Sequence, residues 1–194
     1  MRRTITAAAT LVALSFVGPA LADDAISYSY LEGGYVRTEL DDLDVNGDGF
    51  GIRGSYAFTK NVHGFASYAN QDFDFDITTD EWTVGAGVNF PLSEKLDVVG
   101  TLGYVGVKLD APGLSSIDDS GVEVGAELRG RVNNVLELHG GVAYTNLNDS
   151  GDDTAGRVGA RVYVTKMFAL GADASFNEDG TTWMLGARFD FNHP

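Results

Sequence analysis

Apolar and polar residues alternate along most of this chain, in runs of about ten residues between Phe50 and Phe191. The run 121–132 is the clearest, because its even-numbered positions carry only aliphatic residues or glycine and four of its odd-numbered positions carry Glu or Arg. A period of two puts these sets on opposite faces of a β-strand. Aliphatic side chains on one face and charges on the other are typical of an outer-membrane β-barrel, with lipid outside and a polar lumen.

The same period predicts ten antiparallel strands in an all-β, up-and-down transmembrane barrel, with eight strands as the alternative. An even number returns both termini to the periplasmic side. The registers of 26–37 and 62–73 stay open, because apolar residues fall on both faces there and a bulge would exchange the faces. The predicted strands lie at 26–37, 50–58, 62–73, 82–90, 96–104, 121–132, 136–145, 155–164, 168–176 and 181–191.

The connections between these strands alternate in length and charge. Short connections at 59–61, 91–95, 133–134 and 165–167 should face the periplasm, and three of the four contain a Lys. The others, near 38–48, 71–81, 110–119, 147–154 and 177–180, carry eighteen of the 28 acidic residues and no Lys or Arg. We therefore expect acidic extracellular loops.

The first residues predict export. Arg2 and Arg3 precede the apolar stretch 5–17, and Ala20-Leu21-Ala22 fits the small-residue cleavage rule, so 1–22 reads as a signal peptide and 23–194 as one barrel domain. After this segment no run of about 18 apolar residues follows, which disfavours a membrane-spanning helix. The expected location is the outer membrane of a Gram-negative bacterium, with outer-membrane lipid and lipopolysaccharide as neighbours.

Charge narrows the possible partners. The formal net charge is -15, so nucleic acid, whose recognition needs a basic face, is not expected as a partner. A soluble acidic β-sandwich is the alternative fold, but charges confined to one strand face would lie in its core. The chain has no Cys, so no disulfide or cysteine-linked lipid is possible.

The inward faces predict a network of charges in the lumen. Six arginines meet seven carboxylates there, and we expect ion pairs because an unpaired charge in a confined space is costly. A lumen blocked by side chains is the favoured interpretation. A narrow, weakly cation-selective channel with an acidic extracellular opening is the alternative. The set comprises Glu32, Arg53, Asp97, Glu123, Glu127, Arg129, Arg131, Glu137, Arg157, Arg161, Asp173, Arg188 and Asp190.

One loop motif suggests a metal. Oxygen ligands at Asp42, Asp44, Asn46 and Asp48, with Gly47 at the turn, match the first half of a calcium-binding loop. Arg53 stands where such a loop places a bidentate Glu, so an ordinary Asp/Asn/Gly turn is favoured. No cofactor is expected apart from weak calcium binding at this loop.

Three segments carry a family resemblance: Tyr28-Ser29-Tyr30-Leu31-Glu32-Gly33-Gly34-Tyr35-Val36, Tyr68-Ala69-Asn70-Gln71, and the last strand from Trp183 to Ala187-Arg188-Phe189-Asp190-Phe191. With them the chain resembles small Gram-negative outer-membrane β-barrels of the porin-like superfamily, including barrels described as activators of plant innate immunity. The resemblance implies fold and location across the mature chain. It implies little about activity, because such scaffolds host many roles.

Catalysis is not expected. By the strand map, His63 and His139 lie in the periplasmic half and His193 in the tail, whereas barrel enzymes place a general base at the outer rim. The predicted role is structural or a cell-surface interaction with an unknown partner. A small diffusion channel and a cation-dependent adhesin remain as alternatives.

Overall fold

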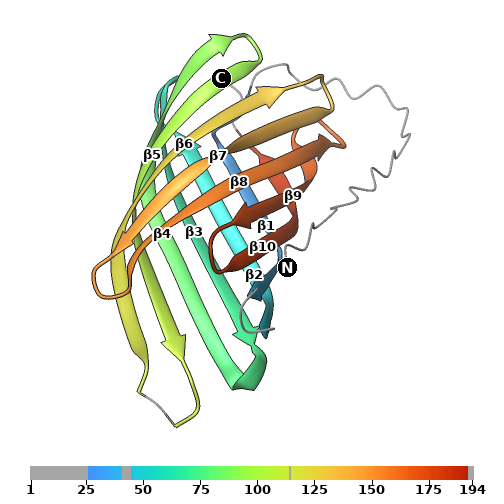
Figure 1. Cartoon of the computed structure of the whole chain (residues 1–194). Helices are drawn as coiled ribbons and strands as arrows, with labels where there is room; N and C mark the ends of the chain where they lie inside the picture. The colour runs from blue at the N-terminus through green and yellow to red at the C-terminus, as the bar shows by residue number, and fades with distance from the viewer. Residues whose placement is uncertain (1–25, 41–44, 114, 192–194) are drawn as a thin grey trace, which may run out of the picture.

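The computed structural model describes residues 26–40, 45–113 and 115–191, and within these ranges the chain forms a closed antiparallel barrel of ten strands. β1 pairs with both β2 and β10, so no sheet edge is left open (Figure 1). Ten strands, rather than the alternative of eight, are thereby confirmed. The predicted signal peptide 1–22 lies outside the described residues and stays a prediction.

Strand lengths vary around the barrel. β4, β5 and β6 have 17, 15 and 15 residues, whereas β9 has nine. The strands are β1 (Tyr30–Leu40), β2 (Val45–Ala57), β3 (Val62–Phe73), β4 (Ile77–Ser93), β5 (Leu96–Asp110), β6 (Ile117–Arg131), β7 (Leu136–Leu147), β8 (Gly151–Tyr163), β9 (Phe168–Phe176) and β10 (Gly180–Asp190). One 3-10 turn, η1 (Asp74–Asp76), joins β3 to β4. No helix among the described residues is long and apolar enough to cross a membrane.

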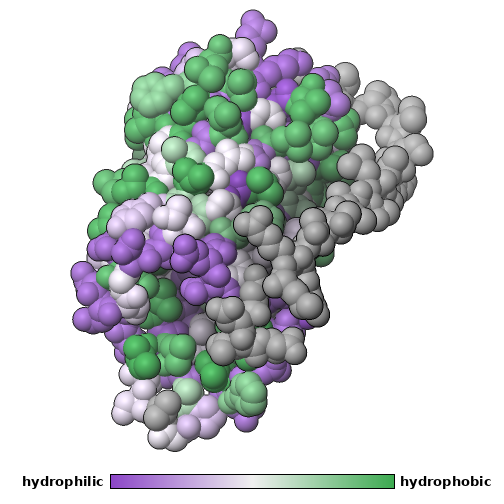
Figure 2. All heavy atoms as spheres, in the orientation of Figure 1, coloured by the Kyte–Doolittle hydropathy of each residue, from purple (hydrophilic) through white to green (hydrophobic). Residues whose placement is uncertain are grey.

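The two strand faces meet different surroundings. Aliphatic and aromatic side chains such as Val122, Leu128 and Leu185 are exposed on the outside, whereas Arg129, Arg131 and other charged side chains are buried inside. Figure 2 shows hydrophobic residues over much of the outer surface, with hydrophilic residues gathered toward the β7–β8 hairpin. The apolar outside is solvated by lipid, and the closed ladder satisfies the backbone there.

The registers that the sequence left open are now assigned. In β1 the even-numbered residues point inward, since Glu32 is 2% exposed and its neighbour Leu31 is 51% exposed. In β3 the odd-numbered residues point inward, with His63 buried and Tyr68 exposed. A register shift between Pro91 and Ser93 marks the end of the β4–β5 ladder, where Pro lacks the donor that regular pairing needs.

The outer boundaries of the predicted strands were wrong. The strands continue into the acidic connections, which shrink to 41–44, 74–76, 111–116, 148–150 and 177–179. Many of the rim acids, among them Asp48, Asp80 and Asp119, therefore lie on strands. Beyond the membrane both strand faces meet water, so the alternation disappears while the backbone pairing continues. At this end the β5–β6 hairpin projects past the rest of the barrel (Figure 1).

Candidate functional site

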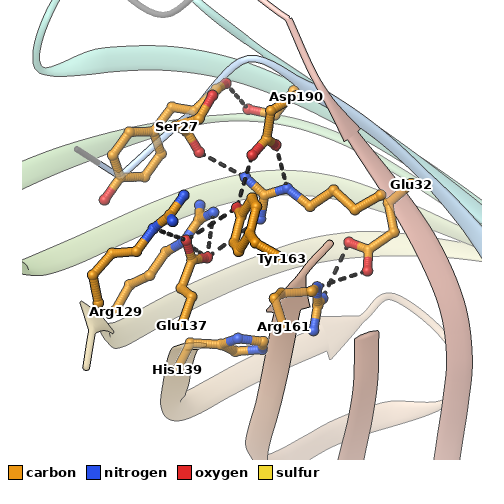
Figure 3. Close-up of polar contacts among 12 residues, drawn as sticks. Ser27, Glu32, Arg129, Glu137, His139, Arg161, Tyr163 and Asp190 are labelled. Atoms are coloured by element: carbon orange, nitrogen blue, oxygen red, sulfur yellow. Dashed lines mark hydrogen bonds and ion pairs between the residues drawn. The ribbon is translucent and has the colours of Figure 1, made fainter. Parts of the chain in front are cut away.

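A cluster of charged side chains centred on Glu137 fills the periplasmic half of the lumen (Figure 3). The Glu137 carboxylate is 0% exposed and lies 2.7 Å from Arg129 Nη2, 3.3 Å from Arg131 Nε and 3.4 Å from Arg188 Nη1. Arg129 and Arg131 lie on β6 and Glu137 on the paired strand β7, whereas Arg188 on β10 reaches them across the lumen because the barrel closes. One carboxylate thus binds three guanidinium groups.

Asp190 and Tyr163 complete this cluster. Arg188 Nε donates to Asp190 Oδ1 at 2.6 Å, and the Tyr163 hydroxyl donates to Asp190 Oδ2 at 2.7 Å. The guanidinium of Arg131 lies 3.8 Å from the Tyr163 ring centroid, and that of Arg188 lies 3.8 Å from the Tyr30 ring. Because aromatic faces attract cations, the rings stabilise arginines that share few acceptors. We call Arg129, Arg131, Glu137, Tyr163, Arg188 and Asp190 the periplasmic plug.

The segment before β1 adds to the plug. Arg188 Nη2 donates to the Ser27 carbonyl at 2.8 Å, and Ser55 Oγ donates to the Tyr28 carbonyl at 2.7 Å. The Tyr28 hydroxyl donates to Asp97 Oδ2 at 2.7 Å, and its ring stacks on His63 with centroids 4.7 Å apart. Ser27, Tyr28 and Ser29 are all buried, so this segment packs against the inward-facing residues of the barrel.

A second ion-pair cluster lies in the middle of the barrel. Arg161 lies 2.8 Å from Glu32 and 2.9 Å from Asp173, and Arg53 binds the same two carboxylates. His139 Nε2 is 2.9 Å from Asp173 Oδ1, so this histidine belongs to the same cluster. Five side chains from five strands are thereby joined in one network.

Two inward glycines make room for this cluster. A Cβ at Gly159 would lie 2.2 Å from Asp173 Oδ1 and 2.3 Å from the His139 ring, and one at Gly171 would lie 2.6 Å from Arg161 Cδ. Such distances are below any real van der Waals contact. The glycines are therefore required by the long polar side chains opposite them.

The lumen also holds a cavity of about 370 Å³ that reaches both clusters. Its charged lining comprises the carboxylates Glu81, Glu123, Glu127 and Asp173 and the guanidinium groups of Arg53, Arg129 and Arg157. Arg157 binds Glu123 in a bidentate pair, with Nη2 2.5 Å from Oε2 and Nη1 3.2 Å from Oε1. Glu127, a member of the predicted network, forms no hydrogen bond or ion pair with another described residue. The cavity is therefore more acidic than the periplasmic plug.

Glu81 is a lumenal residue that the alternation does not predict, because it lies in the acidic connection 71–81. It lines the cavity from β4, two residues before the inward-facing Thr83. Extending the period of two outward from Thr83 would have placed Glu81 on the inner face. The thirteen predicted lumenal residues all lie on strands, and all but Asp97 and Glu127 form ion pairs with arginine or carboxylate partners.

The candidate calcium residues are only partly described. Asp42 and Asp44 lie outside the described residues, and Asn46 and Asp48 lie on β2. The Asp48 carboxylate is 3.2 Å from Arg37 Nη1 and also accepts a hydrogen bond from Tyr35. Within the described ranges no group of three or more His, Cys, Asp or Glu could hold a metal ion. Weak calcium binding therefore stays a prediction.

Comparison with known proteins identifies the fold family. A family model described as outer membrane protein beta-barrel domain matches residues 7–176. No curated protein sequence matches this chain.

Solved structures with a similar fold include the KdgM porin, with a TM-score of 0.50 at 9% identity over 84% of this chain and 99% of the porin chain. The translocator domain of the autotransporter NalP from Neisseria meningitidis has a TM-score of 0.50 at 12% identity, over 84% of this chain and 88% of that chain. Ail, the attachment invasion locus protein of Yersinia pestis, aligns at 21% identity over 85% of this chain and 99% of its own, with a TM-score of 0.44. The first two likenesses show a shared barrel fold. The resemblance to plant-immunity barrels stays a prediction.

Proposed function

Because the chain belongs to the family of outer membrane protein beta-barrel domains and lies in the outer membrane of a Gram-negative bacterium, we propose that it is a closed barrel with a structural or cell-surface interaction role and no catalytic activity. The supporting observation is the periplasmic plug, in which Arg131, Glu137 and Arg188 have side chains no more than 3% exposed. A solute would have to displace these side chains to pass.

The energy of the plug supports a closed resting state. Arg129, Arg131 and Arg188 share the Glu137 carboxylate, so moving that side chain breaks three charge contacts together. Breaking one buried pair by removing a partner costs about 3–5 kcal/mol. Thermal opening of the whole cluster should accordingly be rare.

A small diffusion channel is the second candidate, and the lumenal cavity of about 370 Å³ is the observation that favours it. Its carboxylates Glu81, Glu123 and Glu127 would make such a channel prefer cations. The two candidates differ in whether the plug yields under an applied voltage.

Planar-bilayer recording of the refolded protein tests the proposal. We expect no discrete conductance steps from the wild type, and steps from a variant combining Arg131→Ala with Tyr163→Ala, which removes plug volume. Asp152→Ala, on the exposed end of β8, is the matched control and should behave as wild type. Reproducible conductance steps from the wild type would contradict a plugged lumen and support the diffusion channel.

A further inference from the structure

A second concave site lies on the outer face of the barrel wall, where β4, β5 and β6 extend past the band of exposed apolar residues. The groove has a volume of about 430 Å³ and is lined by Asp80, Trp82, Tyr104, Lys108, Asp118 and Asn148, among others. It is separate from the lumenal cavity, which shares none of these six residues.

Two aromatic rings form one side of the groove. Trp82 and Tyr104 are 41% and 47% exposed, and their ring centroids are 5.7 Å apart. Gly106 on the neighbouring strand allows this arrangement, because a Cβ there would lie 2.4 Å from Trp82 Cε2. The indole therefore lies across β5 and leaves an aromatic platform.

The opposite wall is built by the β7–β8 turn. Asn148 Nδ2 donates to the Ser120 carbonyl at 2.6 Å, and the Asp119 carboxylate accepts the Ser150 backbone N–H at 2.8 Å. The Tyr104 hydroxyl lies 2.7 Å from Ser120 Oγ. These bonds hold the turn against β6, so the hollow is part of the folded wall.

The polar lining of the groove is mainly acidic, because Asp80, Asp118, Asp119 and Asp149 meet a single cation, Lys108. The Tyr68 hydroxyl donates to Asp80 Oδ1 at 2.5 Å, and Asn70 Nδ2 donates to the same oxygen at 3.0 Å. Lys108 Nζ lies 2.5 Å from Asp110 and remains 44% exposed in its side chain. Carboxylate, hydroxyl and ammonium groups thus surround an apolar platform.

This combination fits a sugar better than a bare ion. A pyranose ring presents C–H groups that pack on an aromatic face, and hydroxyls that donate to carboxylates and accept from an ammonium group. Trp and Tyr on the outside of a membrane barrel mark the level of the lipid head groups. A groove that begins at these aromatics and opens away from the lipid therefore faces the saccharide layer of the outer leaflet.

We propose that this groove binds the saccharide head group of lipopolysaccharide, with Trp82 and Tyr104 as the stacking platform and Asp80, Asp118 and Lys108 as polar contacts. This inference rests on the placement of the barrel in the outer membrane and not on the closed lumen. In this proposal the outer parts of β4, β5 and β6 bind a glycolipid on the outside of the barrel.

Fluorescence of the refolded full barrel can test the groove directly. The chain has two Trp, so Trp183→Phe leaves the Trp82 indole as its reporter. We expect the emission of this protein to change saturably on titration with deacylated lipopolysaccharide oligosaccharide. Dephosphorylated oligosaccharide should bind as well, because the platform recognises the sugar ring.

Substitutions in the groove sharpen the test. Gly106→Ala, made with Trp183→Phe, should displace the indole and weaken binding about tenfold, the effect of losing roughly one good contact. Gly140→Ala is the matched control, because a Cβ there meets only ordinary contacts at 3.6 Å. Asn148→Ala, which frees the opposite wall, should also weaken binding and gives a second variant where Gly106→Ala fails to fold.

Several outcomes would overturn the proposal. These are an absence of saturation, equal affinity of the groove variants and the Gly140→Ala control, a dependence on phosphate alone, and the same emission change with phospholipid vesicles that lack glycolipid. Conductance recorded on the same preparations is a separate readout. Conductance steps in those recordings would refute the plugged lumen and would not affect the result for the groove.

Discussion

Replacing Glu137 with Gln gives the most direct test of the periplasmic plug. Gln has the same shape, so the substitution removes a charge with little change in volume. Arg188 keeps its 2.6 Å contact with Asp190, but Arg129 and Arg131 lose the carboxylate that lies 2.7 Å and 3.3 Å away. Arg131 would then be buried without an ion-pair partner, and Arg129 would keep only the more distant carboxylate of Glu127.

The expected loss follows from the cost of a broken buried pair, about 3–5 kcal/mol in the free energy of unfolding. With a urea slope of about 2 kcal/mol/M, the unfolding midpoint should fall by roughly 1.5–2.5 M. The measurement is urea unfolding of the refolded barrel in lipid vesicles, followed by Trp fluorescence. Asp152→Asn, on the exposed end of β8, is the control and should leave the midpoint unchanged. Equal midpoints for Glu137→Gln, Asp152→Asn and wild type would mean that water reaches the arginines and that the plug is not closed.

Three further predictions concern the barrel, its packing and its rim. The folded protein should migrate differently in detergent gels before and after boiling, since the closed ladder resists detergent until heated, and unchanged migration would argue against a closed barrel. Gly159→Val should destabilise the barrel by about 1–3 kcal/mol because its side chain would overlap the Asp173 carboxylate, whereas Gly140→Ala should be tolerated, as compared by urea midpoints. Millimolar calcium should raise the melting temperature more than monovalent salt at matched ionic strength, because oxygen ligands on adjacent loops can share one ion. Asp44→Asn with Asp48→Asn should remove much of this effect if the first loop is its main site, and only a fraction if the whole acidic rim contributes. A melting temperature that does not respond to divalent ions at matched ionic strength would refute the calcium hypothesis.

The strand pattern could be predicted because alternation is a local property. In β6 the pleat alone decides that Val122 and Val124 share a face opposite Glu123, whatever surrounds the strand. Lipid outside and a polar lumen then make that alternation visible in the sequence. The number of strands and their order along the barrel followed from counting such runs.

The outer strand ends were not predictable in the same way. Around Asp80 and Asp119 both faces are polar, so the sequence carries no alternation to follow, although backbone pairing continues. For this reason Glu81 was assigned to a loop and the groove beside Trp82 was not foreseen. Only the paired backbone of neighbouring strands shows where β4 and β6 begin.

Along the strands with clear alternation, the sequence by itself determined which side chains face the lumen, because that choice depends on each strand alone. Which of them bind one another was decided by the closed barrel: Glu32 and Arg161 are 129 residues apart in the chain, and Arg53 and Asp173 are 120 apart. Such partners are set by the tilt and register of all ten strands together, so a network of charges could be expected while its pairs across the lumen could not. The β6–β7 hairpin already places Arg131 beside Glu137, and the closure of the barrel adds Arg188 from β10 to this pair.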